Sequence, residues 1–130
     1  MGNYKLSEVC RIIGVTRRAL QGYDEIGLLN PTDKTRGGYW LYDDRALDKL
    51  ALIQIFVEIG YSRSHIKEIL NNPDLDLKKE YSVAIEALQH KKEKIDQMIN
   101  LLEVNKEILS LPTSVTRPLE KIDAKKVFHN

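Results

Sequence analysis

The 130-residue chain has a single cysteine and no long apolar run. Cys10 has no second cysteine with which to form a disulfide bond, and the sequence contains no Cys-x-x-Cys pair for a metal ion. It also lacks the roughly 20 consecutive apolar residues of a membrane-spanning helix and the apolar core of a signal peptide. We therefore expect a cytoplasmic protein that is not associated with membranes and needs no metal or other cofactor.

The sequence also lacks an excess of positive or negative charge. The chain has 20 basic and 19 acidic residues, so its net charge is +1. So small a net charge does not by itself indicate a nucleic-acid-binding protein, but a local cluster of basic residues can still bind a polyanion. No phosphate-binding loop, nucleophile–base arrangement or carboxylate pair stands out, and we do not expect an enzyme.

Two short amphipathic helices are predicted near the N-terminus. Residues 6–13 and 17–26 place apolar side chains at helical spacing, with Ser7 and Thr16 as the expected N-caps. Gly14 supplies a permissive backbone for the turn between the helices, and this order is the pattern of a helix-turn-helix motif. In the first helix the apolar residues at helical spacing are Leu6, Val9, Ile12 and Ile13, and in the second Ala19, Leu20 and Tyr23 can face inward.

A β-hairpin, or wing, is predicted over residues 28–42. The Gly37-Gly38 pair is typical of a hairpin turn, and the aromatic residues that follow it favour a strand. Strand alternation places Trp40 and Tyr42 on the face opposite to Tyr39, so that one face packs and the other is exposed.

Two further helices follow the wing. Asp43 or Asp44 is expected to cap the third helix, which ends at Gly60. Ser62 is expected to cap the fourth helix, which stops before Pro73 because proline cannot continue a helix.

From Glu80 to about Leu109 the sequence predicts one long amphipathic helix of about 30 residues, or about 45 Å. Its apolar residues follow a heptad pattern over the whole segment. A domain of about 75 residues is too small to cover such a stripe, so we expect the helix to pair with a second copy, for which an antiparallel arrangement is one option. Folding back on its own domain is the alternative. The predicted dimerisation residues are Tyr81, Leu88, Ile95, Met98, Leu102 and Leu109.

Several sequence segments occur in the order and at the spacing of one known family. They are KLSEVCRIIGVTRRALQGYDEIGLLNP (5–31), RGGYWLYDD (36–44) and IQIFVEIGYSRSHIKEIL (53–70). Together they resemble the MerR family of transcription regulators. The long helix and the linker before it look most like the TipA-like branch, which responds to antibiotics and multiple drugs.

The resemblance implies a mainly α fold. Residues 1–75 would form a winged helix-turn-helix DNA-binding domain, and residues 76–110 a long antiparallel coiled-coil dimerisation helix. Residues 111–130 would form a tail that is related to an effector or packed on the partner subunit. The implied function is that of a dimer that binds a pseudo-palindromic promoter operator in double-stranded DNA and distorts it to control transcription. RNA polymerase and a small-molecule effector are further implied partners.

The predicted DNA contacts lie on three elements. The N-terminal residues of a recognition helix enter the major groove, where arginine can bind guanine through two hydrogen bonds. Adjacent arginines point about 100° apart, so one is expected on a base edge and the other on the backbone. The predicted contacts are Thr16, Arg17, Arg18, Gln21 and Tyr23 in the second helix, Arg36, Tyr39, Trp40 and Tyr42 in the wing, and Arg63 in the fourth helix.

Three positions depart from the usual family pattern. The second helix commonly has Leu-Arg-Tyr-Tyr-Asp-Glu, and here Gln21 and Gly22 replace the arginine and the first tyrosine. In the wing, Trp40 replaces a second arginine. Gly22 would permit a closer approach of the backbone to DNA or to a neighbouring element. The lost charges motivate an alternative function, a dimeric protein-interaction module whose winged domain has weakened DNA affinity.

Overall fold

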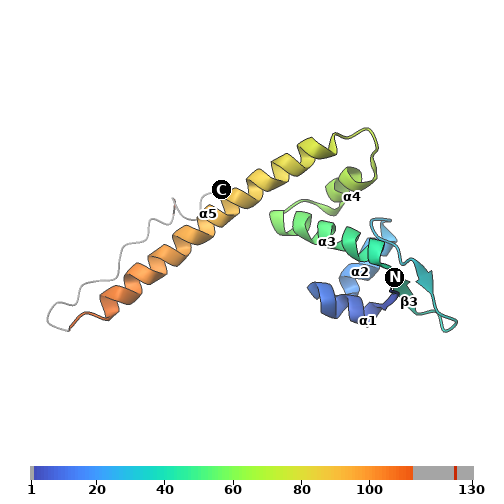
Figure 1. Ribbon diagram of the computed structural model, residues 1–130, viewed down its shortest axis with the longest axis horizontal. Coiled ribbons are helices and arrows are strands. Elements are labelled where there is room, and N and C mark those ends of the chain that lie inside the picture. Colours follow the sequence, from blue (N-terminus) through green and yellow to red (C-terminus); the bar gives the residue numbers. More distant parts are fainter. Residues whose placement is uncertain (1, 113–124, 126–130) are drawn as a thin grey trace. The chain divides into compact units, whose positions relative to one another are not determined.

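The computed structural model describes residues 2–112 and residue 125 of the chain. The fold is mainly helical with a small sheet, as expected from the sequence (Figure 1). Internal contacts divide the chain into residues 1–80 and 81–130, and the two units are described separately. The tail at 111–130, for which an effector-related or packing role was predicted, lies almost entirely outside the described residues.

The first helix of the helix-turn-helix motif has two parts. The α-helix α1 (Leu6–Val9) continues directly into the π-helical segment η1 (Cys10–Gly14). Gly14 ends it with a φ of 82°, a left-handed conformation that glycine adopts without a steric penalty. The prediction of Ser7 as N-cap is wrong, because Lys5 occupies that position. The Glu8 carboxylate accepts a hydrogen bond from the Lys5 backbone N–H at 3.1 Å and helps to fix this helix start.

The second helix, α2 (Arg17–Glu25), begins where the sequence predicted. Thr16 is its N-cap, and the Thr16 Oγ1 atom accepts a hydrogen bond from the Ala19 N–H at 3.0 Å. Leu20 and Tyr23 are buried, so the helix turns this face to the domain core. Gly27 follows the helix with a φ of 72° and allows the chain to reverse.

The sheet has three short antiparallel strands in the order β1 (Tyr4–Lys5), β3 (Trp40–Tyr42), β2 (Asp33–Lys34). The hairpin formed by β2 and β3 confirms the predicted wing (Figure 1). The first strand was not predicted, because two residues are too few for an alternating pattern to be recognised. Pairing of Tyr4 with Tyr42 brings the start of the chain beside the wing.

The start of the chain is also tied to the next helix. The Tyr4 hydroxyl donates a hydrogen bond to Asp44 Oδ1 at 3.0 Å, and the Gly2 backbone N–H donates to Asp44 Oδ2 at 3.3 Å. The bond from Tyr4 and the bond from Gly2 lower the pKa of the Asp44 carboxyl group, because both stabilise its charged form. These contacts hold β1 against the wing and against the beginning of helix α3.

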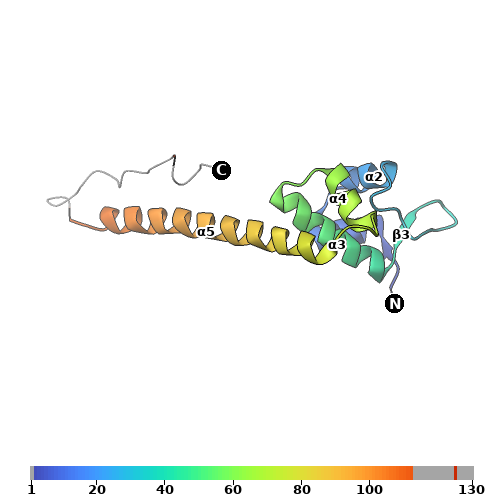
Figure 2. The same cartoon turned by 90° about the horizontal axis from the view of Figure 1, so that it is seen from above.

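Helices α3 (Asp44–Ile59) and α4 (Arg63–Asn71) complete the first unit. Asp43 and Ser62 are their N-caps, as predicted, and Gly60 ends α3 with a φ of 102°. The Tyr61 ring between the two helices stacks on the rings of Phe56 and His65, with centroid separations of 5.4 and 4.7 Å. Figure 2 shows α4 beside α2. The fully buried core of the unit includes Val9, Leu20, Leu28, Tyr42, Leu50, Ile53, Ile66 and Ile69.

The second unit consists mainly of helix α5 (Leu77–Leu109), which begins just before the unit boundary. Its 33 residues form one uninterrupted helix of about 50 Å (Figure 1). Many of its large apolar side chains are exposed, including Tyr81, Leu88, Ile95, Ile99, Leu102 and Leu109. A helix with so long an apolar face is not self-sufficient in water. Among the described residues no helix is long and apolar enough to cross a membrane.

Tyr42 is the one described residue whose buried side-chain polar atom has no hydrogen-bond partner. The side chain is 0% exposed, and burial raises the pKa of its hydroxyl to about 12. We expect Tyr42→Phe to raise the free energy of unfolding by about 1 kcal/mol at neutral pH, because it removes a desolvated and unpaired hydroxyl. Urea denaturation measures this change, and the exposed Tyr39 provides the control variant Tyr39→Phe.

The difference in stability between the wild-type protein and Tyr42→Phe should depend on pH. Because the pKa of Tyr42 is raised in the folded state, its ionisation does not affect the free energy of unfolding below about pH 10. As the pH rises from about 10 through about 12, the unfolded chain ionises first and the folded protein loses stability. The wild-type protein should therefore lose stability relative to Tyr42→Phe across this range. A lower stability of Tyr42→Phe at neutral pH, or parallel pH profiles, would contradict this account.

Candidate nucleic-acid interface

The outer face of α2 carries the polar residues that were predicted to contact DNA. Thr16, Arg17, Arg18 and Gln21 are all exposed, whereas Leu20 and Tyr23 on the opposite face are buried. Because the caps and the core contacts fix the rotation of the helix about its axis, these side chains project outward from a rigid support. The outer face of α2 is therefore available to a ligand.

Arg17 and Arg18 line two different hollows on either side of α2. The hollow on the wing side includes Arg17 together with Lys5, Ser7, Tyr39 and Trp40. It combines two cations with two aromatic rings and contains no carboxylate. Such a lining suits a phosphate group with the sugar that carries it.

The hollow on the other side lies between α2 and α4. Arg18, Gln21 and Gly22 contribute from α2, and Arg63 contributes from the first turn of α4. Glu25 also lines it, so that two cations stand against one carboxylate. The predicted divergence of the two adjacent arginines is thus visible in the structure, because each arginine lines a different hollow, together with a cation from another element.

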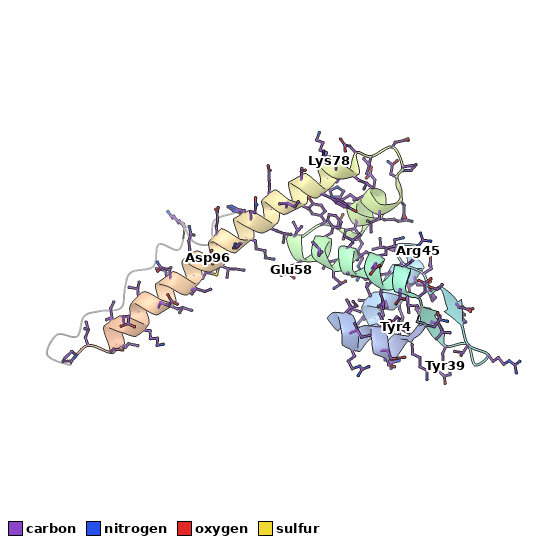
Figure 3. All side chains as sticks on the ribbon, in the orientation of Figure 1. Tyr4, Tyr39, Arg45, Glu58, Lys78 and Asp96 are labelled. Carbon is purple, nitrogen blue, oxygen red and sulfur yellow. The ribbon has the colours of Figure 1, made fainter. Side chains whose placement is uncertain are left out.

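The wing contributes side chains of very different exposure. Tyr39 is 73% exposed and lies on the outside of the wing (Figure 3), and Arg36 near the tip is also exposed. Trp40 is half-buried at the hollow that it shares with Arg17. Tyr42 lies in the core, and its complete burial argues against the DNA contact that was predicted for it. Strand alternation separated Tyr39 from Tyr42 correctly but did not show which face packs.

Tyr23 is a supporting residue of the site. It is only 3% exposed, and its hydroxyl donates a hydrogen bond to Gln54 Oε1 on α3 at 3.1 Å. The burial argues against the predicted DNA contact and agrees with the inward orientation that helical spacing allowed. Its backbone carbonyl accepts hydrogen bonds from the N–H groups of Leu28 and Leu29 at 2.8 and 3.2 Å, which ends the helix.

Two residues that form or support this interface could not be identified from the sequence. Lys5 shares a hollow with Arg17 because β1 pairs with the wing, and no periodic signal marks so short a strand. Gln54 was not recognised as the partner of Tyr23, since the two are 31 residues apart in the chain. Among residues 2–112 and 125, no group of three or more His, Cys, Asp or Glu side chains could hold a metal ion.

Comparison with known proteins defines the class of this domain. The model of the MerR HTH family of regulatory proteins matches residues 4–73, which include both hollows and the whole wing. The chain therefore belongs to the MerR family of helix-turn-helix regulators.

Individual relatives show how far the similarity extends. The HTH-type transcriptional activator mta of Bacillus subtilis is 41% identical over 77% of this chain and 39% of its own length. The transcriptional activator TipA of Streptomyces coelicolor is 31% identical over 93% of this chain and 47% of its own length. This chain thus spans less than half the length of these curated relatives.

Solved structures have the same fold. The N-terminal part of the B. subtilis multidrug transporter activator, MtaN, covers 77% of this chain and 94% of its own chain, with 41% identity and a TM-score of 0.59. HiNmlR, a MerR family regulator lacking the sensor domain and bound to promoter DNA, covers 92% of this chain and 100% of its own, with 20% identity and a TM-score of 0.75.

The supporting role of Tyr23 can be tested directly. Tyr23→Phe removes the hydrogen bond to Gln54 and should lower the free energy of unfolding by about 1 kcal/mol. Affinity for duplex DNA should change less than about twofold, because the ring and the exposed face of α2 stay in place. Urea denaturation and fluorescence anisotropy measure the two quantities. A large loss of affinity at unchanged stability would instead make the hydroxyl a DNA contact.

Proposed function

We propose that this protein is a dimeric regulator that binds a pseudo-palindromic promoter operator and distorts the DNA to control transcription. The observation that carries the proposal is the arrangement of cations around α2. Arg17 and Lys5 line a hollow on one side of the helix, and Arg18 and Arg63 line a hollow on the other. A recognition helix flanked in this way can place its N-terminal residues on base edges while cations on both sides bind phosphates.

The roles of the individual residues follow from their positions. Arg18 and Gln21 on the exposed face are proposed to contact bases, because arginine suits guanine and glutamine suits adenine. Arg17, Arg36 and Arg63 are proposed to bind phosphates, with Thr16 at the helix start and Tyr39 and Trp40 on the wing as further backbone contacts.

The exposed apolar face of α5 supports the dimer. Leu102 and Leu109 are each 72% exposed, and Ile95 is 47% exposed, at successive heptad positions of one helix. We propose that this face packs on the same face of a second copy in an antiparallel pair, as knobs into holes. A dimer of this kind holds two recognition helices at a fixed separation, which a two-fold symmetric operator requires.

Distortion of the operator belongs to the proposal because it explains the need for contacts on both sides of α2. Bending or untwisting DNA costs on the order of several kcal/mol, and phosphate contacts from the wing and from α4 would offset this cost. RNA polymerase at the promoter, acting in the cytoplasm on the distorted DNA, is the proposed recipient of the effect.

The first test is footprinting on genomic fragments of the organism that carries the gene, with its own promoter region included. The expected result is a two-fold symmetric protected region, with hypersensitive sites at its centre where the DNA is distorted. Binding should also weaken steeply as salt increases, because phosphate contacts release counterions. Weak and salt-independent binding to all fragments would reject the proposal and favour a protein-interaction module, for which the missing charges at Gln21 and Trp40 would be the reason.

Arg18→Ala should lower affinity for the protected fragment about tenfold or more, because a well-placed arginine–base pair contributes about 1–3 kcal/mol. Dimer formation should not change, since Arg18 is far in sequence from α5. Arg11→Ala removes the same charge from an exposed residue that lines neither hollow and is the matched control. An equal loss of affinity in both variants would show that Arg18 contributes only its positive charge and not a base contact.

Leu102→Asp tests the dimer. A carboxylate on the exposed apolar face should weaken self-association about tenfold or more, because it would be buried without a partner. Asn100→Asp adds the same charge two residues earlier, at an exposed position away from the apolar heptad positions, and should leave the dimer intact. Analytical ultracentrifugation measures both. A dimer that is unaffected by Leu102→Asp would exclude this face as the interface.

A further inference from the structure

Gly22 lies inside α2, where glycine is less favourable than alanine. Its backbone conformation does not call for glycine, because the positive-φ glycines are Gly14, Gly27, Gly38 and Gly60. A Cβ atom at position 22 would instead lie 2.6 Å from Arg63 Nη1, which is far inside van der Waals contact. The space that a side chain would fill on α2 is therefore occupied by the end of an arginine from α4.

The Arg63 guanidinium is held on this spot by the neighbouring residue. Its central carbon lies 5.0 Å from the centroid of the Tyr23 ring, within the range of a cation–π interaction. Tyr23 itself is fixed by its burial and its bond to Gln54. Within the part of the chain that the structure describes, no carboxylate forms an ion pair with Arg63. The group is thus oriented by the ring without being engaged in an ion pair within this part of the chain.

A second glycine shows that the approach of α4 to α2 is not confined to one point. Lys67, one turn after Arg63, has its Nζ atom 3.5 Å from the position that a Cβ would take on Gly27. Two cations on one side of α4 therefore face the two glycines of the α2 region. Of the two, only Arg63 shares a hollow with Arg18 and Gln21.

We propose that Gly22 is a positioning residue, which allows Arg63 to lie on the surface of the recognition helix and bind a DNA phosphate beside Arg18 and Gln21. The inference rests on the proposed function and deepens it, because it assigns a DNA-facing charge to a pair of residues on two helices. Arg63 thereby supplies, from α4, a positive charge that Gln21 does not supply from α2.

A phosphate fits this arrangement better than a base edge. The Tyr23 ring covers one side of the guanidinium, and the N–H groups on its edge remain able to donate hydrogen bonds. Arginine binds phosphate oxygens through such paired donors. Glu25 in the same hollow opposes an anion, but two arginines stand against it.

The experiment compares Gly22→Ala, Arg63→Ala and the double variant with the wild-type protein. Gly22→Ala leaves the net charge unchanged and adds only a methyl group, which has to displace the flexible end of Arg63. Affinity for a short random-sequence duplex should fall about tenfold in either single variant and about tenfold, not a hundredfold, in the double variant. The slope of the logarithm of affinity against the logarithm of salt concentration should become less steep by about 0.9 per chain in all three variants, because one phosphate contact is lost.

Stability separates positioning from a structural role. The melting temperature of Gly22→Ala should equal or exceed that of the wild type, because alanine favours the helix, so stability and affinity change in opposite directions. Arg11→Ala, in an exposed residue outside both hollows, controls for the loss of one positive charge in Arg63→Ala. The proton signals of the Tyr23 ring should shift in Gly22→Ala, since Arg63 no longer lies over the ring.

Three results would overturn the inference. The first is a Gly22→Ala variant that binds DNA as tightly as the wild type, and the second is a lowered melting temperature of that variant. The third is a hundredfold loss of affinity in the double variant. Each would show that Gly22 does not act through Arg63. Wild-type protein that binds the duplex weakly and independently of salt would overturn the proposed function itself. The two failures are distinguishable because the first leaves wild-type binding and its salt dependence intact.

Discussion

The position of helix α2 depends above all on the contacts of one residue, Tyr23, with three other parts of the domain. Its ring is buried against the core, its hydroxyl donates a hydrogen bond to Gln54 on α3, and its backbone carbonyl closes the end of α2. The same ring also supports the Arg63 guanidinium of α4, whose central carbon lies 5.0 Å from the ring centroid. A single buried aromatic residue thus relates three helices, and the exposed face of α2 is defined by what Tyr23 holds on the other side.

Features that depend on neighbours in the chain could be predicted from the sequence. Thr16, Asp43 and Ser62 cap their helices because each side-chain oxygen accepts a hydrogen bond from the free N–H group three residues later, which is a local interaction. The turn at Gly14, the wing hairpin and the long helix could also be predicted, because each is determined by residues close together in the sequence. The expectation that Ser7 is a cap was wrong. The helix begins earlier, because the Glu8 side chain in its first turn accepts a hydrogen bond from the Lys5 N–H group.

Features that depend on distant segments could not be predicted in this way. The pairing of β1 with the wing, which brings Lys5 to Arg17, joins residues almost 40 positions apart. Alternation along β3 could not decide whether Tyr39 or Tyr42 faces the core, because both faces carry aromatic residues. The sequence left two roles open for Gly22, an approach to DNA or to a neighbouring element, and the structure places Arg63 of a neighbouring element over it.

The contact between Gly22 and Arg63 bears on whether helix α2 can be exchanged between relatives as a separate unit. The surface around α2 is assembled from two segments that lie some 40 residues apart, so residues 16–25 do not constitute it alone. A chimera that received only this helix from another regulator, with a tyrosine at position 22, would force Arg63 away from its place. Transfer of the helix without loss of DNA affinity would then require residues 22 and 63 to be transferred together.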